Sequence, residues 1–212
     1  SAPCSALAAG LPDVRFHWEA TSCTPAPDGW VIQSAGGDTL EARFLVVTAP
    51  PRQALKLVGT ERLAQSLESV RMLPCWAVLA VFEAPLLPDW DAAFVNGGPL
   101  SWLSAQRSRP GKPARESWVL HATADWTVRH LEADATLVAD KLLDATWALP
   151  GANRAQASFI RAHRWRYALA ERPKEVGCLW DAEKRLAIAG DWCQGSRVEG
   201  AFLSGRAAAE RI

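Results

Sequence analysis

Alternation of apolar and polar residues in the first quarter of the chain predicts short strands separated by turns. The run Phe44–Thr48 is apolar without alternation, which is typical of a strand covered on both faces. Pro25–Gly29 and Gly36–Asp38 are rich in residues that favour turns, so we expect the chain to reverse direction there. The predicted strands of this part cover residues 14–19, 30–32 and 40–48.

The middle of the chain predicts an antiparallel sheet, because short apolar runs alternate with clusters of proline and glycine. Helical spacing of apolar residues follows over about 134–148, and Arg107–Pro113 has the composition of an exposed loop. Further strands are predicted at 75–82, 92–95, 100–105, 117–121, 157–164 and 185–189. Further helices are predicted at 53–58, 61–67 and 198–212.

Composition narrows the classes of protein that fit this pattern. Of the 212 residues 49% are hydrophobic and 22% are charged, which is ordinary for a soluble globular chain and argues against disorder. The net charge is zero, with 23 basic and 23 acidic residues, so we expect no nucleic-acid partner. Apolar runs stay far below the roughly 18 residues of a membrane span, so we expect no membrane partner either.

The 5 cysteines are scattered, odd in number and without a CxxC spacing. That arrangement argues against a secreted disulfide framework and against a zinc site, so no metal is expected. No basic and apolar leader opens the chain, and a cytoplasmic location is the expectation. Eleven tryptophans against one tyrosine suggest large rigid surfaces in a core or along a ligand cavity.

The C-terminal block carries the clearest chemical pattern. A short buried strand ends at Gly190–Asp191, and a loop leads into a helix whose free N–H groups and positive dipole end suit an anion or an electron-rich oxygen. Gly195 and Gly200 lack a Cβ, so a planar or phosphorylated ligand could approach the backbone closely. The alternative is an ordinary strand–turn–helix in which the dipole favours Glu199. A small face for tight helix packing is predicted from Ala201, Gly205 and Ala209, with Gly200 and Ser204 alongside.

The block Leu186–Gly205 resembles the C-terminal flavin-binding signature of FAD-dependent oxidoreductases of the two-dinucleotide-binding-domain type, most closely the bacterial renalase-like proteins. In that signature an apolar strand ends in Gly-Asp, and the following helix begins Val-Glu-Gly-Ala with Ser-Gly one turn later, as here. Three other segments resemble the family in the same order along the chain. They are Phe44–Pro51, in which Thr48-Ala49 inverts the family's Ala-Thr pair, Ser117–Trp126 and His163–Ala168.

One family motif is missing from these residues. Proteins of this type hold the ADP half of FAD on a strand–GxGxxG–helix unit, and no GxGxxG occurs in the chain, which starts at Ser1. The expectation is therefore that the chain is the C-terminal part of a longer protein. A missing or separate N-terminal dinucleotide-binding segment is the expected partner, beside a small-molecule substrate.

The resemblance implies roles for residues of the C-terminal block. Gly190 and Asp191 would lie against the ribityl-pyrophosphate part of FAD, with the Asp191 carboxylate or amide as the contact. Val198 and Glu199 would present backbone N–H groups near the flavin pyrimidine edge, where positive character stabilises the anionic reduced flavin. The full set of implied cofactor-binding residues is Gly190, Asp191, Arg197, Val198, Glu199 and Gly200.

A substrate pocket is predicted from a second segment. On a strand, His163, Trp165 and Tyr167 share one face and could shape a pocket over the flavin, while Arg164 and Arg166 would be solvated or pair with a substrate phosphate. The alternative is the amphipathic edge of a sheet. His121 is expected more often as a core histidine than as a base, and Trp118 and Trp126 more often as core than as stacking platforms. No catalytic residue is singled out.

Together these observations predict an α+β fold: an antiparallel substrate-domain sheet plus the C-terminal part of an α/β FAD-binding domain. The expected domains are 1–52, partly of the FAD-binding domain; 53–176, substrate-binding; and 177–212, the FAD-binding strand–loop–helix. By resemblance the function is FAD-dependent oxidation of a small reduced substrate such as a dihydronicotinamide, with oxygen as the expected acceptor. The alternatives are a flavin amine oxidase, or a non-catalytic binding module that does not hold FAD by itself.

Overall fold

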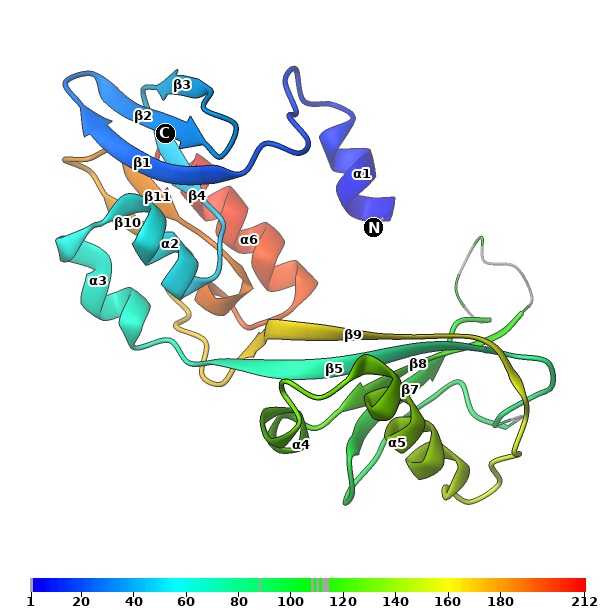
Figure 1. Cartoon of the computed structure of the whole chain (residues 1–212). Coiled ribbons are helices and arrows are strands. Elements are labelled where there is room, and N and C mark those ends of the chain that lie inside the picture. Colours follow the sequence, from blue (N-terminus) through cyan, green and yellow to red (C-terminus); the bar gives the residue numbers. More distant parts are fainter. Residues whose placement is uncertain (1, 88, 108, 110, 112–114) are drawn as a thin grey trace. The chain divides into compact units, whose positions relative to one another are not determined.

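The computed structural model describes residues 2–87, 89–107, 109, 111 and 115–212, and these form two compact units (Figure 1). The first unit joins the residues up to Val70 to Arg172–Ile212, and the second unit is Arg71–Glu171. These divisions differ from the predicted boundaries, which fall after residues 52 and 176. The reason is that the helices that follow residue 50 contact strands of the first unit.

Three antiparallel strands form one sheet of the first unit: β1 (Ala20–Ala26), β2 (Gly29–Ser34) and β3 (Thr39–Ala42). The predicted turn around Gly36–Asp38 is confirmed, since it joins β2 to β3. The strand predicted at 14–19 is wrong, because pairing with β2 begins only at Ala20. Pro25, expected in a turn, lies inside β1, which tolerates it because β1 is an edge strand.

A second sheet of the first unit brings together segments far apart in sequence. Its order is β10 (Leu179–Asp181), β11 (Leu186–Ile188), β4 (Leu45–Val47), and β4 runs parallel to β11. The predicted strand 40–48 is therefore two strands in two sheets. Coverage on both faces is also wrong, since Val46 is 37% exposed.

Helices of the first unit are α1 (Ala2–Ala8), α2 (Pro51–Val58), α3 (Glu61–Glu68) and α6 (Val198–Ala209). Pro51 occupies the first turn of α2, where a missing N–H costs nothing, and Gly59 ends α2 in the left-handed conformation at φ 51°. Ala208 of α6 packs on Ala187 and Ala189, so α6 covers the strand β11. The predicted helices 53–58, 61–67 and 198–212 are confirmed within a few residues.

The second unit is built on one antiparallel sheet with the order β6-β7-β8-β5-β9. The strands predicted in this part are confirmed, although the last one extends to Ala170. Residues 108, 110, 112 and 113 of the predicted loop Arg107–Pro113 lie outside the described residues. The strands are β5 (Met72–Phe82), β6 (Ala92–Phe94), β7 (Leu100–Ala105), β8 (Glu116–Ala122) and β9 (Ala157–Ala170).

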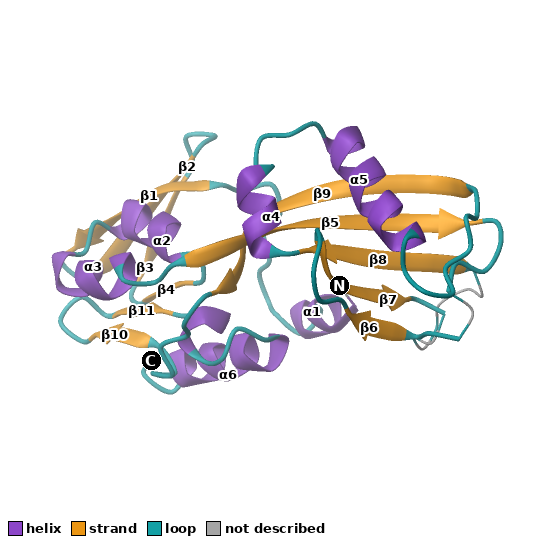
Figure 2. Cartoon of the chain, turned by 90° about the horizontal axis from the view of Figure 1, so that it is seen from below, coloured by secondary structure: helices purple, strands orange, loops and turns teal. Residues whose placement is uncertain are grey.

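Two helices cover one face of this sheet, α4 (Ala124–Arg129) and α5 (Ala135–Trp147) (Figures 1 and 2). The Asp134 carboxylate caps α5 by accepting hydrogen bonds from the N–H groups of Thr136 and Leu137. Trp118 and Trp126 are buried in the core between helices and sheet, as predicted. On the opposite face of the sheet, the described residues of this unit form no helix.

The fold is α+β, as the sequence predicted, with antiparallel sheets beside one parallel strand pair. Within the described part of the chain, no helix combines the length and the apolar character needed to cross a membrane.

Candidate functional site

A cavity of about 640 Å³ opens on the helix-free face of the second unit's sheet. Strands β5, β7, β8 and β9 contribute side chains to it, together with the start of α4. The described residues that line the cavity are Leu73, Pro74, Cys75, Ser101, His121, Ala122, Ala124, Trp165, Tyr167, Ala168 and Leu169. None of these carries a formal charge apart from what His121 can acquire, so the cavity suits an apolar ligand.

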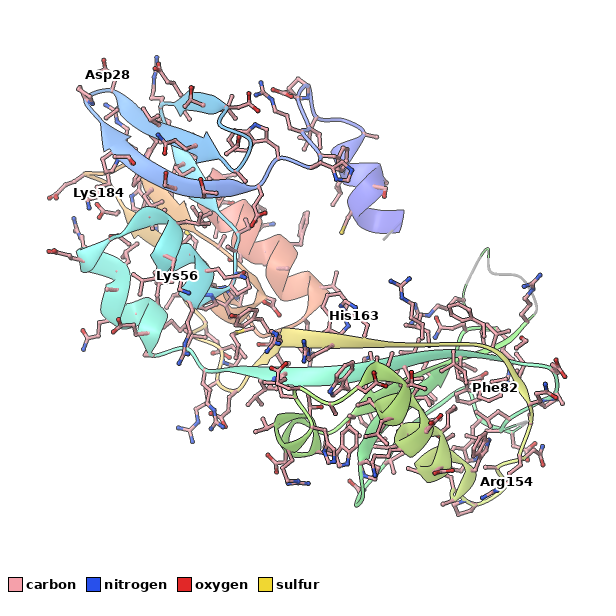
Figure 3. The ribbon with its side chains drawn as sticks, viewed as in Figure 1. Asp28, Lys56, Phe82, Arg154, His163 and Lys184 are labelled. Atoms are coloured by element: carbon pink, nitrogen blue, oxygen red, sulfur yellow. The ribbon has the colours of Figure 1, made fainter. Side chains whose placement is uncertain are left out.

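Strand β9 supplies the large side chains of the cavity. Trp165 and His163 pair across the ladder with Cys75 and Ala77, two positions apart, so they lie on one face of the sheet as predicted. Trp165 and Tyr167 line the cavity and are 54% and 39% exposed. His163, labelled in Figure 3, does not line it; its ring meets the Trp165 ring edge-on at 4.4 Å.

The arginines of β9, predicted to be solvated or to pair with a substrate phosphate, pair with a carboxylate of their own unit. Arg164 donates to Glu132 at 2.6 Å and also to the carbonyl of Leu131. Arg166 donates to both carboxylate oxygens of Glu132, at 2.8 and 3.0 Å. These hydrogen bonds hold the pKa of the Glu132 carboxyl below its usual range. Both arginines are therefore occupied within the unit.

His121 of β8 lines the cavity, whereas the sequence favoured a core histidine at this position. Its ring is half-buried and lies 5.2 Å from the Trp102 ring at a tilt of 46°. Burial lowers the pKa of His121 from its ordinary value of 6.5, so the neutral imidazole predominates at neutral pH. Strand alternation was the signal that could have found it, because Trp118, Leu120 and Ala122 occupy the opposite, helix-covered face.

Cys75 and Ser101 also line the cavity, but their polar atoms already have partners. The Cys75 thiol points to the carbonyl oxygens of Trp76 and Ala122, at 3.3 and 3.6 Å. Burial raises the pKa of Cys75 to about 11, so it stays a thiol at neutral pH and is no nucleophile. The Ser101 hydroxyl donates to the carbonyls of His121 and Ala122, at 3.2 and 3.1 Å.

The predicted cofactor-binding residues gather in the first unit, where β11 meets α6. Gly190 donates its N–H to the Ser204 hydroxyl at 3.0 Å, which ties the end of the strand to the helix. One Asp191 carboxylate oxygen accepts the N–H of Trp192 at 2.9 Å, at the start of a short 3-10 turn (Asp191–Cys193). The Asp191 carbonyl accepts the N–H groups of Gln194 and Ser196, which folds the loop back on itself.

The first turn of α6 is open toward solvent. Arg197 is the N-cap residue, no side chain caps the helix, and Val198 is 83% exposed. Glu199 is exposed beside it, so the helix start leaves N–H groups for an external acceptor. In addition, the indole N–H of Trp192 is buried without a partner among the described residues. Free donors at a strand–turn–helix fit the flavin contact that the motif implies.

The three glycines of this segment differ in what lies beside them. A Cβ at Gly200 would collide with the carbonyl of Gln194, and a Cβ at Gly190 would lie 2.5 Å from the Trp192 indole nitrogen. The chain itself therefore fills the space that both glycines leave. Beside Gly195 the space is open, and its φ of 98° lies in the left-handed region that favours glycine, so the predicted close approach of a ligand there stays a prediction.

The packing face predicted for α6 is confirmed at Gly200 and Ser204 and is wrong at Ala201 and Ala209. The buried residues are Gly200, Ser204 and Ala208, whereas Ala201 and Ala209 are exposed. The helix turns this face inward because Ser204 meets Gly190 and Ala208 meets Ala187 and Ala189. Among the residues that the structure describes, no cluster of three or more His, Cys, Asp or Glu side chains could hold a metal ion.

Comparison with known proteins identifies the family: residues 1–212 match the model of flavin containing amine oxidoreductases. The chain belongs to this family. Its cofactor is FAD, which confirms the cofactor prediction.

Solved structures of other proteins share the fold of this chain. Cyclohexylamine oxidase from Brevibacterium oxydans IH-35A is similar with a TM-score of 0.72 and 16% identity, covering 92% of this chain and 48% of that protein. Wild-type putrescine oxidase bound to putrescine has a TM-score of 0.66 and 15% identity, covering 97% of this chain and 50% of that one. The chain thus spans about half the length of the structures that it matches.

Proposed function

We propose that this chain provides the substrate cavity and the C-terminal FAD contacts of an oxidoreductase that oxidises a small, neutral, ring-bearing substrate. A dihydronicotinamide is such a substrate, and the renalase-like motif favours it. The observation that carries the proposal is the cavity: aromatic rings line it, and none of its described lining residues is Asp, Glu, Lys or Arg. An apolar, water-poor wall favours transfer of a hydride over loss of a proton to solvent.

Each group of residues has a role in this proposal. Trp165 and Tyr167 bind the flat face of the substrate. Asp191 and the first-turn N–H groups of Val198 and Glu199 hold FAD, which supplies the hydride acceptor when bound. The ADP half of FAD requires a phosphate-binding turn, so the proposal needs a segment that carries GxGxxG as a partner of these residues.

Amine oxidation is the second candidate. The names of cyclohexylamine oxidase and putrescine oxidase favour it, because both proteins share the fold. With no carboxylate among the described lining residues, an amine would occupy the cavity as the neutral base rather than as an ammonium ion. A third candidate, a binding module that never holds FAD, predicts that purified protein has no flavin absorbance.

The test is reduction of the flavin in the FAD-loaded protein without oxygen. We expect isomeric dihydronicotinamides to bleach the flavin absorbance, and cyclohexylamine or putrescine to leave it unchanged. The substitution Trp165→Leu should slow bleaching roughly 10-fold, as loss of one aromatic contact implies. Phe94→Leu is the matched control, because Phe94 lies in the same sheet, is 84% exposed and does not line the cavity.

The outcomes separate the candidates. Bleaching by amines alone would transfer the assignment to amine oxidation. Flavin that neither class of compound bleaches would contradict both enzymatic proposals.

A further inference from the structure

The buried tryptophans of this chain differ in what their indole N–H groups meet. That of Trp30 donates to the carbonyl oxygen of Lys184 at 2.7 Å. That of Trp118 donates to the Glu116 carboxylate, also at 2.7 Å. Trp192 is 2% exposed, and its indole N–H has no partner among the described residues. Because a buried donor without an acceptor costs free energy, such a group marks a place where an acceptor from elsewhere would bind.

The Trp192 indole lies at the turn that is proposed to contact FAD. Its nitrogen packs against Gly190, where an added Cβ would lie 2.5 Å from it. The backbone of Trp192 is held on both sides, since its N–H donates to the Asp191 carboxylate and its carbonyl accepts the N–H of Lys174, each at 2.9 Å. Among the described residues no hydrogen bond holds the indole, so the ring can turn about its side-chain bonds without breaking one.

The two polar side chains of this turn match different parts of a flavin cofactor. The Asp191 carboxylate can only accept hydrogen bonds, so it suits the hydroxyl groups of a ribityl chain and repels a phosphate. The Trp192 indole can only donate, so it suits a phosphate oxygen. The open start of α6, which follows this turn, also favours negative charge through its free N–H groups and its dipole.

We propose that Trp192 binds the cofactor by donating its indole N–H to the flavin-side phosphate of FAD. This inference rests on the proposed function, in which Asp191 and the start of α6 hold FAD, and adds a residue and its phosphate partner to that site. The nitrogen is closed to solvent in the described chain, so the ring turns away from Gly190 toward the phosphate as the cofactor binds. The phosphate oxygen then supplies the acceptor that this N–H lacks.

FMN and riboflavin test the proposal, because they share the flavin and the ribityl chain and differ only in the phosphate. Calorimetric titration of the full chain should show tighter binding of FMN. Trp192→Phe should reduce this preference about 10-fold, the scale of one hydrogen bond to a charged group, and leave the affinity for riboflavin unchanged. In ¹H–¹⁵N spectra of the unmodified chain, the indole signal that Trp192→Phe removes should shift more with FMN than with riboflavin.

Trp147→Phe is the matched control. Trp147 lies in α5 of the second unit, and its buried indole N–H also has no partner among the described residues. This variant should keep the full preference for FMN. Equal affinities for FMN and riboflavin, no binding of either, a preference that Trp192→Phe leaves unchanged, or an indole signal that FMN does not move would overturn the inference.

Flavin reduction is a separate measurement, so the two proposals can fail independently. Bleaching by a dihydronicotinamide without any effect of Trp192→Phe on FMN binding would overturn this inference alone. A loss of FMN preference in Trp192→Phe without bleaching would overturn only the proposed function.

Discussion

One carboxylate oxygen of Asp191 accepts a hydrogen bond from the N–H of Trp192. The other oxygen has no partner among the described residues. We expect Asp191→Ala to weaken FAD binding roughly 10- to 150-fold, the range for loss of a charge-assisted hydrogen bond. Titration of FAD into the flavin-free protein, followed by flavin fluorescence, would measure this affinity. Asp191→Asn, which keeps an acceptor for the Trp192 N–H, is the matched variant and should lose less.

Unchanged FAD affinity in Asp191→Ala would show that this residue only caps the turn. Melting curves of both variants would separate a loss of FAD contact from a loss of loop stability, because Asp191 also holds the loop through its carbonyl. A backbone contact survives substitution, so the loop should keep its shape.

Residue roles were predicted unevenly from the sequence. Trp165 and Tyr167 were placed on one face correctly, because side chains alternate along a strand whatever the fold around it. The partner of Arg164 and Arg166 was not predicted, because Glu132 lies outside the strand and only the folded unit brings it near. His121 was undervalued for a similar reason, since the sequence does not tell which face of a sheet the helices will cover.

The two central glycines of α6 show how an element depends on its surroundings. A methyl group at Gly200 would meet the Gln194 carbonyl, whereas one at Gly205 would meet nothing within 4 Å. We expect Gly200→Ala to lower the free energy of unfolding by about 1–3 kcal/mol through overpacking. Gly205→Ala should raise it by about 1 kcal/mol through better helix propensity.

Urea denaturation of the two variants and the unmodified chain would compare these effects within one helix. Equal stability of both variants would contradict the close approach of α6 to the loop before it. A gain in Gly200→Ala would show that the loop yields without cost.

The sequence predicts helices and strands well where the local pattern of apolar residues determines them. The strands of the second unit and α5 lie within a few residues of their predicted positions, because their apolar periodicity is sustained. The short stretch at 14–19 also alternates but forms no strand, since no partner strand reaches it. The split of 40–48 follows from pairing too, as β3 joins β2 while β4 joins β11.

At the scale of the whole molecule, the 212-residue chain made by itself should be colourless. Its sequence contains no GxGxxG turn for the ADP phosphates, so most of the binding free energy of FAD is missing. It should also self-associate, because Val198 and Phe202, one turn apart on α6, are 83% and 56% exposed. Absorbance spectra and analytical ultracentrifugation would measure both properties.

A yellow, monomeric preparation of these residues with full flavin occupancy would refute that expectation. It would mean that the chain contains a nucleotide site other than the open start of α6. Val198→Ser together with Phe202→Ser should reduce self-association, and Ala201→Ser, on the same exposed helix, is the control.

The α+β class, most of the strands and the flavin motif follow from the sequence alone, because periodicity, turn residues and a contiguous Gly-Asp signature are local properties. The tertiary structure decided which glycines the chain itself fills, which partner Arg164 and Arg166 take, and that His121 borders a cavity. The arginine pairing and the cavity depend on contacts between residues far apart in sequence, such as Glu132 with Arg164 and Arg166. Such contacts form only when the sheets assemble, so no local pattern encodes them.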